Sequence, residues 1–295
     1  MNYQQFVSTL NQTTSQLFES GITVRIHSAL KNNGARRTGL TISQEGSNIS
    51  PTIYLEEYYQ QFQNGRNLED IAQSLVRLYH EVKFEHPWEV NQVQDFQYAK
   101  SRLACKLIHF EKNQALLKDI PHVPYLDLAI VFFLLLETTE KGSATILITN
   151  DIMEYWGVPL ELLYRLAIEN TPRLLQAECK PMQVVICELL GQPCPEEEEE
   201  SGMYVLSNHH RHFGAACILY DRVLEDIGNQ LNEDYYVLPS SIHEMIILPV
   251  SCLSDQMDLD SMITEINETQ VSEEEVLSDH AYYFSRKENR LLPTR

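Results

Sequence analysis

The chain has 295 residues, which is enough for one large domain or two ordinary ones with a sizeable buried core. Hydrophobic residues make up 43% of it, a fraction that excludes global disorder. Acidic residues outnumber basic ones by 42 to 22, and the resulting formal charge of -20 makes non-specific binding to nucleic acids or anionic membranes unfavourable.

The cysteines and the apolar segments indicate a cytoplasmic protein. The six cysteines form no C-x-x-C pair, and three of them lie in apolar stretches, as free thiols usually do. The first residues contain neither a basic nor an apolar segment, so we expect no signal peptide. The most apolar run, Leu126 to Leu136, contains Asp127 and is too short to cross a bilayer. We therefore expect an intracellular protein without a membrane span.

Three helices and one hairpin are predicted in the first part of the chain. The helices rest on apolar residues at helical spacing, and the hairpin rests on an Asn-Asn-Gly stretch between two β-prone runs. In chain order the elements are a helix between Tyr3 and Phe18, strands Ile22 to Leu30 and Thr38 to Ser43, a helix from Pro51 to Gln63, and a helix from Leu68 to Val82.

The remainder of the chain is richer in β patterns. The predicted strands are Leu103 to Phe110, Asp127 to Leu136, Ala144 to Thr149, Tyr204 to Leu206, two strands within Tyr235 to Pro249, and Ala281 to Ser285 with Arg290 to Leu292. The predicted helices are Asn113 to Lys118, a short one capped by Asn150 and Asp151, one ending at Pro172, one beginning at Pro181, Gly214 to Leu231, and one around Leu259 to Ile266. The prolines, glycines and five consecutive glutamates of residues 191–202 predict a solvated acidic loop.

This order of elements predicts an α+β fold with largely antiparallel, hairpin-connected strands. The elements divide into two mixed helix and strand halves, residues 1–176 and 177–295, which could also form one continuous domain.

Several strings of the sequence resemble an uncharacterised domain-of-unknown-function family, DUF5688, from anaerobic gut Firmicutes. The strings are NNGARRTGLTI (32–42), ISPTIYLEEYY (49–59), MYVLSN (203–208), GAACILY (214–220), LPSSIHEMIILP (238–249) and EVLSDHAYYFSR (275–286). The resemblance spans nearly the whole chain. It implies a cytoplasmic bacterial protein with no assigned activity, and it supplies no catalytic residues.

The segment from Tyr235 to Pro249 gathers the residue types of nucleophilic catalysis. Ser240 and Ser241 lie close to His243, and a serine nucleophile needs a base within hydrogen-bond reach and a group that orients this base. Asp279 and the adjacent His280 are alternative partners from a later strand.

The same segment also suits a purely structural role, which we favour. Serines at a hairpin turn bond the local backbone, and His243 can pack or pair with Glu244. The segment has no G-x-S-x-G motif, and no glycine adjoins either serine to form an oxyanion hole.

The string NHHRHF places His210 and His212 two positions apart, a spacing that suits metal ligation on a strand. A metal site needs three or four converging ligands, and the sequence shows two, so we expect no metal here.

Arg36 and Arg37 follow the predicted hairpin tip within an acid-free stretch, residues 21–44. Two adjacent arginines could hold a phosphate or an acidic partner. The alternative is pairing with the acidic residues 251–279 of the same chain, which contain nine carboxylates and no Lys or Arg.

Two functional hypotheses follow. The first is a non-enzymatic cytoplasmic binding or regulatory protein that recognises a protein partner or basic ligand through its acidic surface. The second is a hydrolase that uses His243 with Ser240 or Ser241. Neither requires a cofactor, and no cofactor motif is present. Binding to nucleic acid or membrane is not expected, and the oligomeric state stays open.

Overall fold

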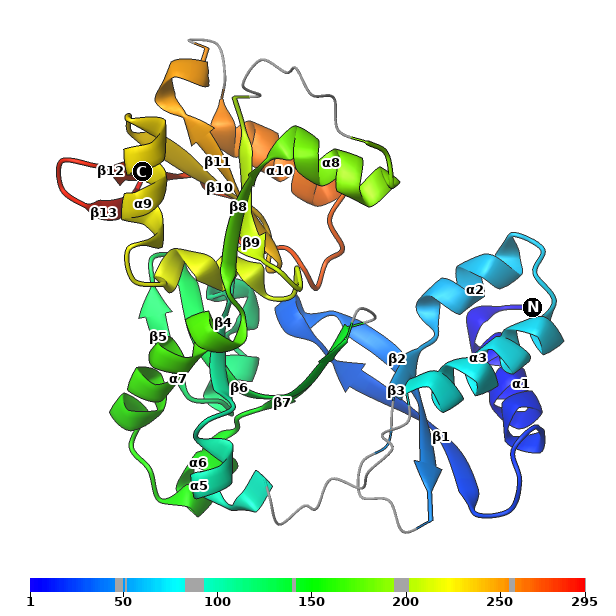
Figure 1. The fold of residues 1–295 in the computed structure, drawn as a ribbon. Coiled ribbons are helices and arrows are strands. Elements are labelled where there is room, and N and C mark those ends of the chain that lie inside the picture. Colours follow the sequence, from blue (N-terminus) through cyan, green and yellow to red (C-terminus); the bar gives the residue numbers. More distant parts are fainter. Residues whose placement is uncertain are drawn as a thin grey trace. The chain divides into compact units, whose positions relative to one another are not determined.

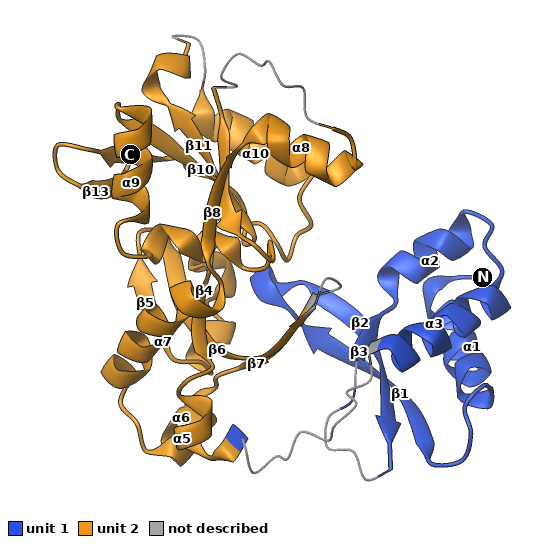
Figure 2. Cartoon of the chain, viewed as in Figure 1, with its two compact units in different colours: residues 1–93 blue, residues 94–295 orange. Residues whose placement is uncertain are grey.

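The computed structural model describes residues 1–45, 50, 52–82, 93–139, 142–193, 202–254 and 258–294. They form two compact units, residues 1–93 and residues 94–295 (Figure 2). Residues 176 and 177, where the sequence suggested a boundary between halves, lie inside the second unit. The acidic loop predicted at residues 191–202 falls mostly outside the described residues.

The first unit is a three-stranded antiparallel sheet with helices packed on one face (Figure 1). Its elements are α1 (Tyr3–Gln16), β1 (Ile22–Leu30), η1 (Asn32–Gly34), β2 (Arg36–Gln44), β3 (Thr52–Tyr54), α2 (Glu56–Gln63) and α3 (Leu68–Val82). The sheet order is β1-β2-β3, and β1 pairs with β2 over their full length. The predicted hairpin is therefore confirmed, with Asn33 in the left-handed conformation that its turn requires.

Alternating burial fixes which face of this sheet is covered. Every second residue at the start of β1 is exposed, while Leu40 and Ile42 of β2 are fully buried. On α1, Phe6 and Leu10 are buried one helical turn apart, and Asn2 begins the helix with a capping box. These side chains form one core with α3.

The helix predicted from Pro51 begins later than expected. Residues 52–54 form β3 instead, with Ile53 opposite Leu40 of β2 and buried in the core. Threonine and isoleucine favour strands, and the edge of β2 offers backbone groups to pair with. Tertiary pairing thus overrides the helix-start signal, and α2 begins only at Glu56.

The second unit contains two antiparallel sheets (Figure 1). The four-stranded sheet has the order β4-β6-β5, with β7 also paired to β6; the six-stranded sheet has the order β13-β12-β10-β11-β9-β8. The elements up to α7 are α5 (Phe96–Ala99), β4 (Leu103–His109), η2 (Glu111–Asn113), η3 (Leu116–Lys118), β5 (His122–Tyr125), β6 (Leu128–Thr139), β7 (Gly142–Leu147), α6 (Asn150–Trp156) and α7 (Leu160–Leu174). Those that follow are β8 (Ala177–Pro181), α8 (Met182–Leu190), β9 (Tyr204–Asn208), η4 (Gly214–Leu219), α9 (Val223–Leu231), β10 (Tyr235–Ser241), β11 (Glu244–Pro249), η5 (Val250–Cys252), α10 (Leu259–Thr269), β12 (Tyr282–Ser285) and β13 (Arg290–Pro293).

Helices protect exposed parts of both sheets. β4 is an edge strand, and the hydroxyl of Thr171 on α7 accepts a hydrogen bond from the Cys105 backbone N–H at 3.0 Å. α10 packs on the six-stranded sheet, where Leu259 and Ile263 join a core with Leu238 and Leu248.

A carboxylate and a pair of aromatic rings join the two sheets. Asp127 in the β5–β6 turn accepts hydrogen bonds from Ser278 Oγ and from Tyr282 OH, each at 2.5 Å. Burial and the Asp127 carboxylate raise the pKa of Tyr282 above its usual value, so its hydroxyl stays protonated and donates. The rings of Phe133 on β6 and Phe213 before η4 lie 5.3 Å apart.

The helix predicted from Gly214 to Leu231 is wrong as one element. It divides into η4 and α9 at a turn in which Arg222 has a φ of 63°. Tyr220 explains the break, because its ring is buried and its hydroxyl donates to the Leu175 carbonyl at 2.8 Å. Continuing the helix would carry this side chain away from its acceptor.

The observed architecture confirms the α+β prediction. Both units mix helices with strands, and every pairing among the described strands is antiparallel. Within the described ranges, no helix combines the length and the apolar character that crossing a membrane requires.

Asp127→Ala should reduce the free energy of unfolding by about 2–4 kcal/mol, because it leaves the buried hydroxyls of Ser278 and Tyr282 without their acceptor. Urea unfolding followed by circular dichroism measures the change. Asp119→Ala, at an exposed position of the same unit, is the control and should change stability by less than about 0.5 kcal/mol. Equal stability of the two variants would contradict the assigned role of Asp127.

Candidate functional site

Two segments singled out by the sequence meet in the second unit. β9 and β11 pair antiparallel with Leu206 opposite Met245, so the end of β9 lies beside the start of β11. The histidine-rich loop after β9 therefore contacts the β10–β11 turn. The rings of His212 and His243 lie 5.3 Å apart. We call these two residues, together with Phe213, Lys106 and Glu275, which contact them or each other, the imidazole cluster.

Asn208 shapes the loop that carries His212. This residue is fully buried, and its Oδ1 accepts from the backbone N–H groups of His210 at 3.1 Å and His212 at 3.3 Å. Its Nδ2 donates to the His212 carbonyl at 2.9 Å. One buried side chain thus supplies hydrogen bonds to the backbone of the loop on both sides of Arg211.

Gly214 lets the loop close onto the turn. A Cβ at this position would lie 2.5 Å from the His243 carbonyl oxygen and 2.9 Å from the Asn208 backbone nitrogen, which is closer than real Cβ atoms approach. A donated hydrogen bond from Ser207 Oγ to the same carbonyl, at 2.8 Å, fixes this approach. Only glycine leaves room for the contact.

The two serines of the turn support its backbone. Ser241 Oγ accepts from the His243 backbone N–H at 3.0 Å, and Ser240 Oγ donates to Glu244 Oε1 at 3.3 Å. Ser241 and Glu244 close the hairpin as a pair, with Ile242 and His243 between them.

Both nitrogens of the His243 ring face partners other than serine. Nδ1 accepts from the Phe213 backbone N–H at 3.2 Å, so the ring proton lies on Nε2. Nε2 faces Glu275 Oε1 at 3.5 Å. The ring also stacks on Phe213, with the two planes 11° apart.

His212 has a strongly altered acidity. Burial, followed by the charges of His243, Lys106 and His210, lowers the pKa of His212 to about 4. Lys106 reaches the cluster from β4 and places its Nζ 4.2 Å from the Phe213 ring centroid. His212 is therefore neutral at pH 7, because burial and neighbouring positive charge both disfavour its protonated form.

The two imidazoles differ in whether their ring nitrogens already have partners in the protein. The His243 nitrogens are engaged, whereas no hydrogen bond occupies the His212 ring nitrogens within the part of the chain that the structure describes. One nitrogen of a neutral imidazole can donate a hydrogen bond to a ligand, and the other nitrogen can accept one. Hydrolysis by His243 with Ser240 or Ser241 stays a prediction, and neither hydroxyl hydrogen-bonds to the imidazole.

Asp279 and His280 lie in a separate polar network. Asp279 accepts from Asn267 Nδ2 at 2.8 Å and pairs with Lys112 at 3.3 Å. Burial opposes ionisation of Asp279, but these contacts outweigh it and lower the pKa of the carboxyl. His280 Nδ1 lies 3.1 Å from Asp260 Oδ2. No contact joins either residue to His243 among the described residues.

The remaining candidates belong to different units of the chain. Among the described residues, no group of three or more His, Cys, Asp or Glu side chains could hold a metal ion, so His210 and His212 have no further ligand there. In the first unit, Arg36 is exposed at the start of β2, while Arg37 is half-buried opposite Ala29.

Two members of the imidazole cluster were not identified from the sequence. Lys106 is the one cation in the apolar strand LACKLIH, and a lone charge of this kind is a signal that could have been used. Glu275 lies 32 positions after His243, and no local pattern connects them.

The acidity of His212 predicts a pH-dependent stability. Because its pKa is lower in the folded than in the unfolded chain, the contribution is complete above pH 6.5 and is lost as the pH falls from 6.5 towards 4. After allowance for solvent at a half-buried ring, this loss should amount to about 1–2 kcal/mol.

Chemical unfolding between pH 7.5 and about 4.5 tests this, with His212→Gln as the variant that cannot titrate. The wild type should lose about 1–2 kcal/mol more than the variant across this range. His209→Gln, whose side chain is 54% exposed on the same loop, is the matched control. Parallel pH profiles for wild type and His212→Gln would show that the ring does not titrate as described.

Gly214→Ala should destabilise the second unit by about 2 kcal/mol or more, since the new Cβ collides with backbone atoms of His243 and Asn208. Thermal unfolding measures this. Ala215→Gly, which enlarges no side chain, is the control and should cost about 1 kcal/mol at most. A Gly214→Ala protein as stable as the wild type would rule out the close approach of loop and turn.

Comparison with known proteins identifies the chain only at the level of its family. No curated protein and no solved structure matches it. The family described as "Family of unknown function (DUF5688)" matches residues 3–286, essentially the whole chain. The protein belongs to the DUF5688 family.

Proposed function

We propose that this protein is a cytoplasmic binding protein that recognises a basic, amphipathic segment of a partner protein. The observation that carries the proposal is the apolar surface of α8. Ile186, Leu189 and Leu190 of this helix are 47%, 71% and 64% exposed, and they share one face because they are spaced three and four positions apart.

Exposure of this kind requires a reason, because large aliphatic side chains gain free energy when they leave water. Scattered apolar residues are common on protein surfaces, but a contiguous patch marks an interaction site. In α8, Val185 is buried and Met182, Val184 and Cys187 are half-buried, whereas the three apolar side chains of the shared face are exposed. A partner helix that lays its own apolar face on α8 would cover this patch.

Charges around α8 select the chemistry of the partner. Glu188 on the helix pairs with Lys180 at 2.7 Å and with Arg211 at 2.6 Å, so the nearby cations are already engaged. In the sequence, the run of five glutamates from Glu196 to Glu200 begins six positions after Leu190, close to the end of this helix. Lysines or arginines beside the apolar face of a partner would meet this acidic run.

A labelled synthetic helical peptide of leucine and lysine tests the proposal by fluorescence anisotropy with the full chain. The double variant Leu189→Glu with Leu190→Glu should weaken binding about tenfold or more, since it removes apolar contact. The added negative charges would strengthen a purely electrostatic interaction, so the direction of the change separates the two causes.

Two further variants complete this test. Changing Glu196 to Glu200 into glutamine should weaken binding and reduce its dependence on salt. Tyr155→Glu, at a side chain 68% exposed on α6, is the control and should leave the affinity unchanged. Unchanged or tighter binding by the double leucine variant would refute docking on α8.

A further inference from the structure

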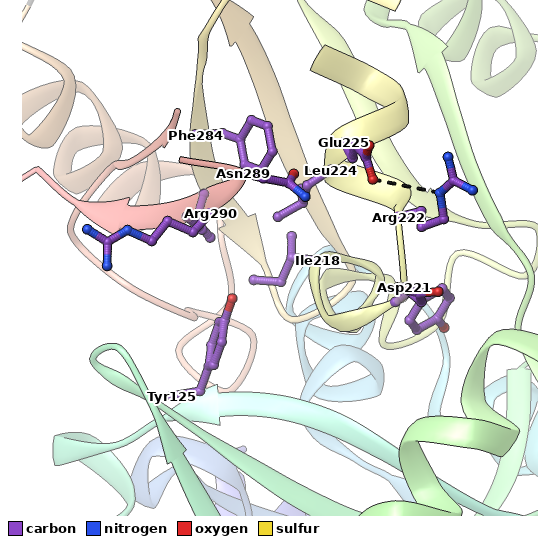
Figure 3. Close-up of a pocket in the computed structure, with 11 residues that line it drawn as sticks. Tyr125, Ile218, Asp221, Arg222, Leu224, Glu225, Phe284, Asn289 and Arg290 are labelled. Atoms are coloured by element: carbon purple, nitrogen blue, oxygen red, sulfur yellow. Dashed lines mark ion pairs between the residues drawn. The ribbon is translucent and has the colours of Figure 1, made fainter. Parts of the chain in front are cut away.

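A groove on the second unit lies between α9 and the β12–β13 hairpin. In the six-stranded sheet, β13 is one edge strand and β8 is the other, so the groove lies at the edge away from β8. It consists of two adjoining pockets of about 410 and 380 Å³ that share Glu225, Phe284 and Asn289. Figure 3 shows the first of them. Each volume lies within the range of small-molecule sites, and the shared residues make the two pockets neighbours.

Unused polar groups converge on an apolar floor in the first pocket. Ile218, Leu224 and Phe284 form the floor. The Tyr125 side chain rises from β5 towards it, and the Asn289 amide points into the same space (Figure 3). Neither polar group has a hydrogen-bond partner among the residues that the structure describes. Burial raises the pKa of Tyr125, so its hydroxyl stays protonated and can donate.

Backbone conformations that are rare for side-chain-bearing residues present these groups. Arg222 and Asn289 line the groove with φ values of 63° and 48°, and Leu126, next to Tyr125, has a φ of 55°. Asparagine tolerates this conformation, but leucine and arginine seldom adopt it. Such strain concentrates where a side chain must be placed for a ligand.

The second pocket is cationic although the chain is strongly acidic. Arg286 and Lys287 line it, and Arg290 follows on the same hairpin. Arg290 is held by Glu288 at 2.6 Å, whereas Lys287 has no ion pair with any described residue. The Arg286 stem lies close to Gly228 of α9, which leaves its charged end at the groove.

We propose that this groove binds a purine nucleoside monophosphate. An asparagine amide offers one donor and one acceptor, which matches the edge of adenine. The half-buried ring of Tyr125 lines the same pocket and can contact the base. Glu225, shared by both pockets, lies 3.7 Å from Arg222 (Figure 3) and can still accept hydrogen bonds from the ribose hydroxyls, as carboxylates do in other nucleotide sites. The phosphate then meets Arg286 and Lys287.

Titration calorimetry of the full chain with AMP tests the site, with inorganic phosphate and adenosine as separate probes. AMP should bind with a micromolar dissociation constant and more tightly than either probe alone, because it engages both pockets. Absence of saturable AMP binding, or equal affinity for AMP and phosphate, overturns the proposal.

Variants test whether the first pocket holds the base and the second pocket holds the phosphate. Asn289→Asp keeps a residue that tolerates the left-handed backbone but removes the amide donor, and it should weaken AMP binding about tenfold. Lys287→Glu changes an exposed side chain and should weaken AMP binding about tenfold while leaving adenosine binding unchanged. Lys118→Glu, an equal charge change at another exposed position, is the control. Wild-type affinity in both groove variants would refute the assignment.

Discussion

The carboxylate of Asp127 is the constraint on which the second unit depends. Ser278 and Tyr282 of the six-stranded sheet region donate to it from buried positions, and buried hydroxyls without acceptors are costly. Leu126, immediately before Asp127 in the β5–β6 turn, takes a left-handed conformation with a φ of 55°. The same turn leaves Tyr125 at the groove. At another point of the junction, Lys106 of β4 lies over the Phe213 ring. Both the imidazole cluster and the groove therefore combine residues from the two sheets.

The candidate sites differ less in their residue types than in whether their polar atoms already form hydrogen bonds within the protein. His243, Ser240 and Ser241 have the side chains of a catalytic site, but their polar atoms hold the β10–β11 turn and the loop before η4. A side chain used this way must break existing bonds before it can meet a substrate. Tyr125 and Asn289 have ordinary side chains whose polar atoms face a cavity. These differences in partner state are our reason for proposing binding surfaces rather than acid–base chemistry at His243.

The sequence predicts elements well where local signals and tertiary packing agree. The β1–β2 hairpin follows from alternation and its Asn-Asn-Gly turn, and β12–β13 from apolar runs around a charged turn. β3 and β8 are short, and each forms by pairing with a neighbour, so their own residues carry a weak signal. The break at Arg222 depends on the distant acceptor of Tyr220. The imidazole cluster shows the same limit: both histidines were candidates, but their meeting depends on the pairing of β9 with β11.

The two proposed binding surfaces differ in sign, and this difference has a physical consequence. The surface on α8 adjoins an acidic run and suits a cationic partner, whereas the groove collects Arg286 and Lys287 and suits an anion. At physiological ionic strength, charges separated by more than about 8 Å are largely screened, so each ligand responds mainly to the charges that it touches. At low ionic strength, where this screening is weak, the formal charge of -20 favours encounter with the cation and slows encounter with the anion. A net acidic chain can therefore hold an anion where two of its cations, here Arg286 and Lys287, lie side by side on one hairpin.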